Sequence, residues 1–437
     1  MNRRIKINTE TPVWIALFLL YAIPVYGSNI FVRLTRIHIG SASLSMFHLF
    51  ALLSFCIAFT KARLWSINRN NLYDILFVFL FLIRFVYIIV GVGNGYHAFS
   101  DFTIEIMGPA FYIIIKTSYR LLEAGIADFC IKISRLFSIN LIINLVMLLT
   151  ENTGIWGGTR YLGNKWGGYY FDGLLIFVPI SMYLLISNKY IVHKSSWIFY
   201  LALGLLFLVL NDSRALFLIV IMGAVVSSFI ALKSDRAGRI SKRALQRLFP
   251  FVMLGLIFLC MFLSSNASLL ERLLSINWAS ESDSLGTRFM TYDYNIGFIK
   301  DNIFGEGLGF CVPTINRYGR IEIMENKFYV DNYLITFCRR LGVIPFIMQC
   351  FFYLLPIVYL YQIYKQKREK DYIVVILIYL LLLFQGTVFS SQLYHCNFIY
   401  VPVWAIAAFA NEERKIIFRN RVPRHYNAFC QEKLFEC

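Results

Sequence analysis

Long apolar runs recur along almost the whole chain, and short polar segments separate them. A run of about 17–25 apolar residues is long enough to cross roughly 30 Å of hydrocarbon as an α-helix. Hydropathy predicts such spans at 12–29, 43–60, 73–92, 102–116, 134–150, 172–187, 197–211, 214–232, 249–264, 342–363, 372–389 and 397–411. The pattern therefore predicts an all-α polytopic integral membrane protein with about twelve transmembrane helices, in which residues 1–437 form a single membrane domain.

Composition and the placement of charge support this prediction. The 437 residues are 58% hydrophobic and only 15% charged, whereas a soluble domain has about 25% charged residues. The net charge of +17 comes mainly from basic clusters at 1–6, 61–69, 116–135, 188–194, 233–247 and 365–370 and from a basic tail at 412–437. The positive-inside rule assigns these segments, and both termini, to the cytoplasm. The cations thus indicate topology and attract anionic headgroups, and nucleic acid is not an expected partner.

One predicted outer loop is much longer than the others. Residues 265–341 separate the ninth and tenth spans, and a loop of this length is usually functional or structured. Apolar spacing predicts helices at 267–276 and 287–299. The stretch NIFGEGLGF at 302–310 is predicted to form a tight turn in which glycines supply positive φ.

A second, shorter outer loop lies at 151–173. It is rich in Gly, Trp and Tyr and carries Arg160 and Lys165. Its aromatic residues suit anchoring at the membrane interface first and stacking against sugars second.

The stretch NDSR at 211–214 places Asp212 and Arg214 in a short turn between two apolar spans. An Arg this close to hydrocarbon usually faces the bundle interior, a wet cavity or a counter-ion. Two interpretations stay open from the residues alone. Arg214 is either a snorkelling cation paired with Asp212 or a cation aimed at an anionic ligand on the outer face.

Other charged residues near the predicted spans raise the same question. Arg84 and Glu105 lie inside two spans, where we expect an intramembrane ion pair of structural or functional origin. Arg339 and Arg340 flank the tenth span on the outer side, against the positive-inside rule. An anionic ligand and a rim that holds lipid headgroups both fit these two arginines.

Several motifs follow one another in chain order: Ser213-Arg214 at the start of a span, Arg288, the turn from Asn302 to Gly309, and Asp331-Asn332-Tyr333-Leu334 followed by Leu341-Gly342. This series resembles the O-antigen ligase and O-antigen polymerase (Wzy-type) superfamily. The motifs cover roughly residues 200–345, and the layout of the spans extends the resemblance to the whole chain. Asp331 stands where the ligases commonly carry His, which favours a polymerase.

The resemblance implies a GT-C-like membrane glycosyltransferase at the periplasmic face of the bacterial inner membrane. Its donor is a glycan on undecaprenyl pyrophosphate, and its acceptor is a hydroxyl of a lipid-linked repeat unit. No metal and no cofactor are implied. Membrane lipids are expected partners, and a chain-length regulator is a further partner that the resemblance allows.

The resemblance also assigns roles to residues. The expected catalytic residues are Arg214, Arg288, Asp331 and Asn332. The two arginines stabilise the leaving diphosphate, Asp331 accepts or orients the proton of the acceptor hydroxyl, with His395 as a fallback base, and Asn332 positions a sugar or that carboxylate. The expected residues for binding diphosphate or glycan are Arg160, Lys165, Arg339, Arg340, Gly307 and Gly309.

Two alternatives stay open. An O-antigen ligase, which joins the glycan to the lipid A core, shares the fold and differs in its acceptor. A flippase or transporter of lipid-linked oligosaccharides belongs to another class. The long outer segment and the lack of repetition between the two halves of the sequence favour the enzyme over the transporter.

Overall fold

The computed structural model describes residues 10–23, 35–39, 42–61, 71–150, 168–187, 194–210, 214–233, 284–310, 314–315, 321–322, 332–389 and 397–419, with isolated positions between 246 and 260. Nearly all of these residues are helical, as the sequence predicts. Two short antiparallel hairpins are the exception: β1 (Arg36–Ile39) pairs with β2 (Ala42–Ser45), and β3 (Thr314–Ile315) pairs with β4 (Ile321–Glu322).

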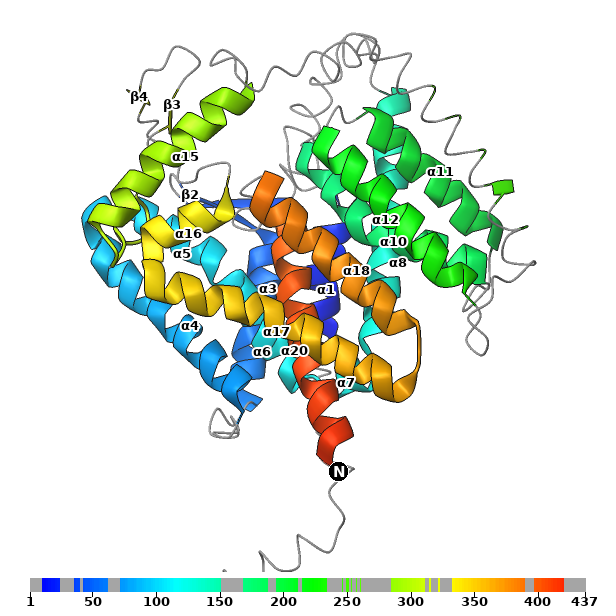
Figure 1. Ribbon diagram of the computed structural model, residues 1–437, viewed down its shortest axis with the longest axis horizontal. Coiled ribbons are helices and arrows are strands. Elements are labelled where there is room, and N and C mark those ends of the chain that lie inside the picture. Colours follow the sequence, from blue (N-terminus) through cyan, green and yellow to red (C-terminus); the bar gives the residue numbers. More distant parts are fainter. Residues whose placement is uncertain are drawn as a thin grey trace, which may run out of the picture.

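The helices of the first half, in chain order, are α1 (Thr11–Tyr21), α3 (Met46–Lys61), α4 (Leu72–Val90), the 3₁₀ turn η2 (Gly91–Asn94), α5 (Tyr96–Glu105), α6 (Met107–Thr117), α7 (Tyr119–Ala124) and α8 (Ile126–Thr150). The second half contains the 3₁₀ turn η3 (Gly168–Gly173), α10 (Leu174–Ser187), α11 (Lys194–Leu210), α12 (Arg214–Leu232), α15 (Ser284–Asp301), α16 (Tyr333–Leu341), α17 (Val343–Lys367), α18 (Asp371–Phe384), the π-helical turn η4 (Gln385–Phe389) and α20 (Asn397–Arg419). Figure 1 shows their arrangement.

The centre of the bundle is aromatic. The helices α6 and α20 pack together there, and Gly108 permits their approach because a Cβ on it would lie 2.3 Å from the Trp404 ring. Trp404 is fully buried, and its ring centroid lies 4.4 Å from that of Phe352. Phe77 and Tyr112 stack at 4.2 Å. Such ring pairs stabilise a core beyond the area they bury, and here they join α4, α6, α17 and α20.

Several of these helices can cross a membrane. Four described segments are long and apolar enough, namely Leu72–Asn94, His97–Thr117, Ile126–Val146 and Val343–Lys367. Shorter apolar helices lie at Thr11–Tyr21, Met46–Thr60, Phe171–Ser187, Lys194–Leu208, Leu216–Leu232 and Asp371–Thr387. All overlap predicted spans, so the multi-pass architecture is confirmed. The predicted span at 249–264 lies outside the described residues apart from isolated positions, and the count of twelve stays a prediction.

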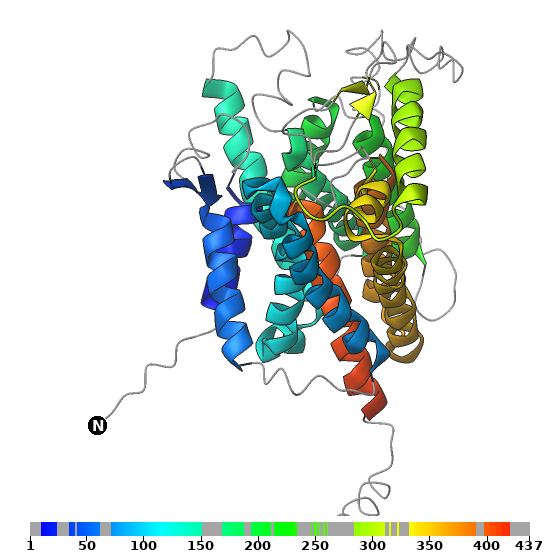
Figure 2. The ribbon, with the colours of Figure 1, turned by 90° about the vertical axis from the view of Figure 1, so that its left-hand side faces the viewer.

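Most helices run between two ends of the molecule (Figure 2). The end of α20 and the connection from α17 to α18 lie at one end, and α15 and α16 lie toward the other (Figures 1 and 2). We call the first the basic end, because Lys116, Lys367 and Lys415 lie there. The positive-inside rule predicts that the basic end faces the cytoplasm; we call the opposite end the outer end.

A buried carboxylate organises the basic end. Asp74, near the start of α4, accepts hydrogen bonds from Lys116 at 2.8 Å, from Lys415 at 2.7 Å and from Asn411 at 2.9 Å. Burial opposes protonation of Lys415, but Glu412 and Asp74 outweigh it and raise the pKa of the Lys415 amine. These contacts tie α4, α6 and α20 together.

A glycine turn organises the outer end. We call residues 302–309 the outer turn. Within it, the φ angles of Gly305, Gly307 and Gly309 are 85°, 88° and 78°. The N–H groups of Glu306 and Gly307 donate to the carbonyls of Arg339 and Arg340 in α16, and Leu308 N–H donates to Tyr87 in α4. The turn therefore joins α4 to α16, and the predicted glycine turn is confirmed.

We expect Gly309→Ala to destabilise the protein, because a Cβ on this residue would lie 2.2 Å from the backbone N of Ala98. Left-handed backbone costs a non-glycine residue about 1–2 kcal/mol and overpacking about 1–3 kcal/mol, so the expected loss is roughly 2–5 kcal/mol. The measurement is the thermal midpoint of the purified protein in detergent. Gly297→Ala in α15 is the matched control, since a Cβ there meets nothing within 4 Å. Equal midpoints for the two variants would contradict the role given to the turn.

Candidate functional site

The predicted site residues fall into three groups. The first group lies at the outer end and is described by the structure: Arg288, Asn332, Arg339 and Arg340 with their side chains, together with Gly307 and Gly309. Arg214 is the first residue of α12, but its side chain lies outside the described part of the structure. Arg160, Lys165, Asp331 and the fallback base His395 also lie outside it.

Arg288 is an exposed residue of α15. The face of α15 that meets α16 buries Thr291 and Asn295, which are 6% and 0% exposed. Residues separated by three and seven positions share one side of a helix, so Arg288 lies on the same side, about 10 Å along the axis from Asn295. The predicted helix at 287–299 is confirmed as α15, which brings Arg288 to the outer end.

Arg339 is enclosed by protein groups. Its Nε and Nη2 donate to the Glu306 carboxylate at 3.1 and 2.6 Å, and its Nη1 donates to Asn295 Oδ1 at 2.5 Å. The guanidinium carbon lies 4.6 Å from the ring centroid of Phe298 and 4.7 Å from that of Phe310. Arg339 thus joins α16 to the outer turn and to α15.

Arg340 points to a different carboxylate. Its Nη1 lies 3.2 Å from Asp101 Oδ1, and both side chains are 1% exposed. Asp101 Oδ2 also accepts the N–H of Gly309 at 2.8 Å. Arg339 and Arg340 lie at the outer end, against the positive-inside rule. Glu306 compensates the charge of Arg339, and Asp101 compensates that of Arg340.

The predicted intramembrane pair of Arg84 and Glu105 is confirmed, with Nε 3.2 Å from Oε2 and both side chains buried. Arg84 also donates to Gln349 at 3.1 Å. The break between α5 and α6 follows from Pro109, which has no N–H for the Glu105 carbonyl four residues earlier. The Tyr400 hydroxyl donates to that carbonyl at 2.8 Å instead.

Asn332 is the N-cap of α16. Its backbone is extended, with φ of −148° and ψ of 115°, and its side chain accepts the N–H of Ile335 at 3.2 Å. A cap of this kind stabilises a helix by about 1 kcal/mol. Asn332 thus fixes the start of the helix that carries Arg339 and Arg340.

Sequence reasoning missed the three partners Glu306, Asp101 and Asn295. The sequence did give a signal for Asp101. In FSDFTIE it stands four residues before Glu105, so the two carboxylates share one side of an apolar helix, where each needs a cationic partner. Glu306 gave a weaker signal as the only acid between the turn glycines. Nothing in the sequence marked Asn295.

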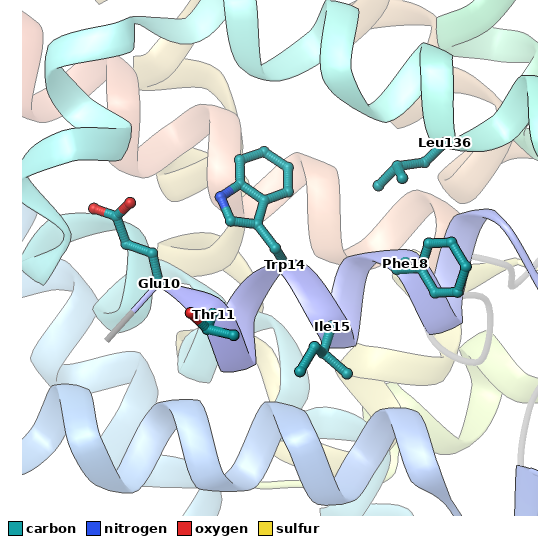
Figure 3. Close-up of a pocket in the computed structure, with 6 residues that line it drawn as sticks. All are labelled: Glu10, Thr11, Trp14, Ile15, Phe18 and Leu136. Atoms are coloured by element: carbon teal, nitrogen blue, oxygen red, sulfur yellow. The ribbon is translucent and has the colours of Figure 1, made fainter. Parts of the chain in front are cut away.

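An apolar cavity of about 490 Å³ lies elsewhere, between α1 and α8 (Figure 3). Its lining residues are Glu10, Thr11, Trp14, Ile15, Phe18 and Leu136. Glu10 accepts a hydrogen bond from Ser118, just after α6, so the Glu10 side of the cavity lies toward the basic end. Within the described ranges no three His, Cys, Asp or Glu side chains lie together as metal ligands.

Comparison with known proteins bears on the outer end. Residues 199–350 match a family model, Wzy_C, described as O-antigen ligase. The matched stretch runs from α11 into α17 and contains Arg214, Arg288, the outer turn and Asn332. No curated protein matches the chain.

We expect Glu105→Gln to destabilise the fold strongly, because it leaves the buried Arg84 charge uncompensated. Loss of one partner of a buried pair costs about 3–5 kcal/mol. The double variant Arg84→Gln/Glu105→Gln should recover part of that loss. Thermal midpoints in detergent measure both effects. Asp128→Asn is the control, since the exposed Lys132–Asp128 pair contributes about 0.5 kcal/mol. A midpoint for Glu105→Gln no lower than for Asp128→Asn would contradict the assignment.

Proposed function

We propose that this chain belongs to the Wzy/O-antigen ligase superfamily, whose family model matches residues 199–350 and whose members are membrane enzymes that act on lipid-linked sugars. From this premise we propose that the protein is an O-antigen polymerase. It transfers glycan from undecaprenyl pyrophosphate to a hydroxyl of a lipid-linked repeat unit, at the periplasmic face of a bacterial inner membrane.

The proposed reaction is a substitution at the anomeric carbon of the donor. The acceptor oxygen forms the new glycosidic bond as the bond from the anomeric carbon to the phosphate oxygen breaks. The diphosphate leaves with the electron pair, and the hydroxyl proton passes to a base, for which Asp331 is the candidate and His395 the fallback. The principal demand on the protein is stabilisation of the negative charge that develops on the diphosphate.

The observation that carries the proposal is the exposure of Arg288 at the outer end, within the matched stretch. Arg339 and Arg340 are buried against Glu306 and Asp101. Arg288 is exposed, and a guanidinium can bind phosphate oxygens through two parallel hydrogen bonds. Among the predicted cations with described side chains, it is therefore the one we assign to the diphosphate.

Arg214 is the second cation that we assign to the diphosphate. It begins α12, and η4 contacts both α12 and α16. The first turn of a helix carries partial positive charge and unpaired N–H groups, which favour an anion.

The choice of a polymerase over a ligase rests on Asp331, which stands where the ligases commonly carry His.

We expect Arg288→Ala to lower polymerisation by at least about 100-fold, in line with the loss of one group that stabilises transition-state charge. The measurement is glycan length in a strain that lacks its own polymerase and carries this protein with its cognate repeat-unit genes. Wild type should give a ladder of glycan lengths. The Arg288→Ala variant should give only single units, although the two proteins are present at equal levels. Lys300→Ala, which removes another exposed cation of α15, is the matched control and should keep the ladder.

The same strain separates the alternatives. If well-expressed wild type gives only single glycan units, and these units are joined to a supplied lipid A core acceptor, the protein is a ligase. Repeat units that reach the periplasm only when the protein is present would identify a flippase. A full ladder from Arg288→Ala would remove Arg288 from the proposed chemistry.

A further inference from the structure

The contacts of Arg339 point to a role that neither the family match nor its position as an outer cation suggests. We infer that Arg339, Glu306 and Asn295, which we call the α15 clamp, are positioning residues that hold α15 so that Arg288 faces the donor diphosphate. The inference rests on the proposed function and adds to it the groups that orient its principal cation.

The clamp leaves Arg339 little capacity to bind a ligand. All three guanidinium nitrogens donate to protein oxygens: Nε to Glu306 at 3.1 Å, Nη2 to Glu306 at 2.8 and 2.6 Å, and Nη1 to Asn295 Oδ1. The rings of Phe298 and Phe310 lie within cation–π distance of the guanidinium. The side chain is 1% exposed. An incoming diphosphate would have to displace a carboxylate from a buried site, which is costly.

The clamp joins three segments that are not consecutive in the chain. Asn295 belongs to α15, Glu306 to the outer turn and Arg339 to α16. The backbone of the turn bonds to α16 and to α4, so two of the three segments are fixed to the bundle. The helix α15 contacts α16 and the β3 strand, and Figures 1 and 2 show it at the outer extremity of the described bundle. The hydrogen bond from Arg339 to Asn295 is a direct link between α16 and α15.

The amide of Asn295 is oriented for this contact. Its Nδ2 donates to the Thr291 carbonyl at 2.6 Å, which turns Oδ1 toward Arg339. Asn295 is fully buried. Arg288 lies two turns away on the same side of α15, so a rotation of the helix at Asn295 carries Arg288 with it. A misplacement of roughly 1 Å at a reacting centre can cost 100-fold in rate.

The first test uses the full chain in lipid nanodiscs. Asn295→Ala removes the link to α15 but keeps the Arg339–Glu306 ion pair, and Glu306→Gln weakens the ion pair itself. We expect both to raise hydrogen–deuterium exchange at residues 288–301 by at least about tenfold, because exchange reports local opening. Asp293→Asn, at an exposed position of the same helix, is the control. Exchange equal to wild type in Asn295→Ala would overturn the inference, whether or not Glu306→Gln folds.

The second test asks whether the clamp acts through Arg288. In transfer assays with purified protein and lipid-linked repeat units, we expect Asn295→Ala to lower kcat at least about tenfold with little change in KM. In an Arg288→Lys background the same substitution should lower kcat less than about threefold, because the group it positions is already altered. If Asn295→Ala lowers kcat by the same factor in both backgrounds, the substitution damages the fold in general, and the inference is overturned.

The two tests also separate the clamp from the proposed function. If well-folded wild type shows no transfer activity, the proposed function fails, and the role of the clamp toward Arg288 fails with it. Exchange at α15 would still report whether Asn295 and Arg339 hold the helix. If wild type is active and Asn295→Ala changes neither exchange nor kcat, the proposed function stands and the clamp is wrong.

Discussion

The outer end of this protein depends on the pairing of buried guanidinium groups with carboxylates. Arg84, Arg339 and Arg340 are each at most 2% exposed, and a charge in such a place costs several kcal/mol unless a partner compensates it. The partners Glu105, Glu306 and Asp101 come from other segments of the chain. The sequence can therefore bury these arginines only if α4, α5, the outer turn and α16 assemble together.

The glycines of the outer turn make that assembly possible. A side chain at Gly305, Gly307 or Gly309 would collide with backbone atoms of α16, η2 or α5, so the turn can lie between these helices only without one. The Asn332 cap and the left-handed Gly342 delimit α16. The result is a fixed platform of α4, α5 and α16, on which α15 presents Arg288. In the proposed function, this buried platform supports the exposed Arg288.

Much of this architecture follows from local sequence. Apolar runs predict the helices, G-E-G-L-G predicts the turn, and two opposite charges inside apolar spans predict the pair of Arg84 and Glu105. The fates of Arg339 and Arg340 were not predictable in the same way. Their exception to the positive-inside rule is visible in the sequence, but their carboxylate partners lie far away in it, and no periodicity links them. The sequence left an anionic ligand and a rim of lipid headgroups open as partners, and the fold supplies Glu306 and Asp101 beside the two arginines. The proposed roles of Arg160, Lys165 and Asp331 stay predictions, since these residues lie outside the described structure.

In the proposed reaction, the exposed Arg288 at the outer end assists departure of a lipid diphosphate as a glycosidic bond forms. The most direct measurement supplies purified protein in proteoliposomes with lipid-linked repeat units and follows released undecaprenyl pyrophosphate together with glycan length. We expect one diphosphate released for each new linkage in wild type, and neither product when Arg288 is replaced by Ala in a folded protein. Lengthening without release of diphosphate, or release that is unchanged in that variant, would contradict it.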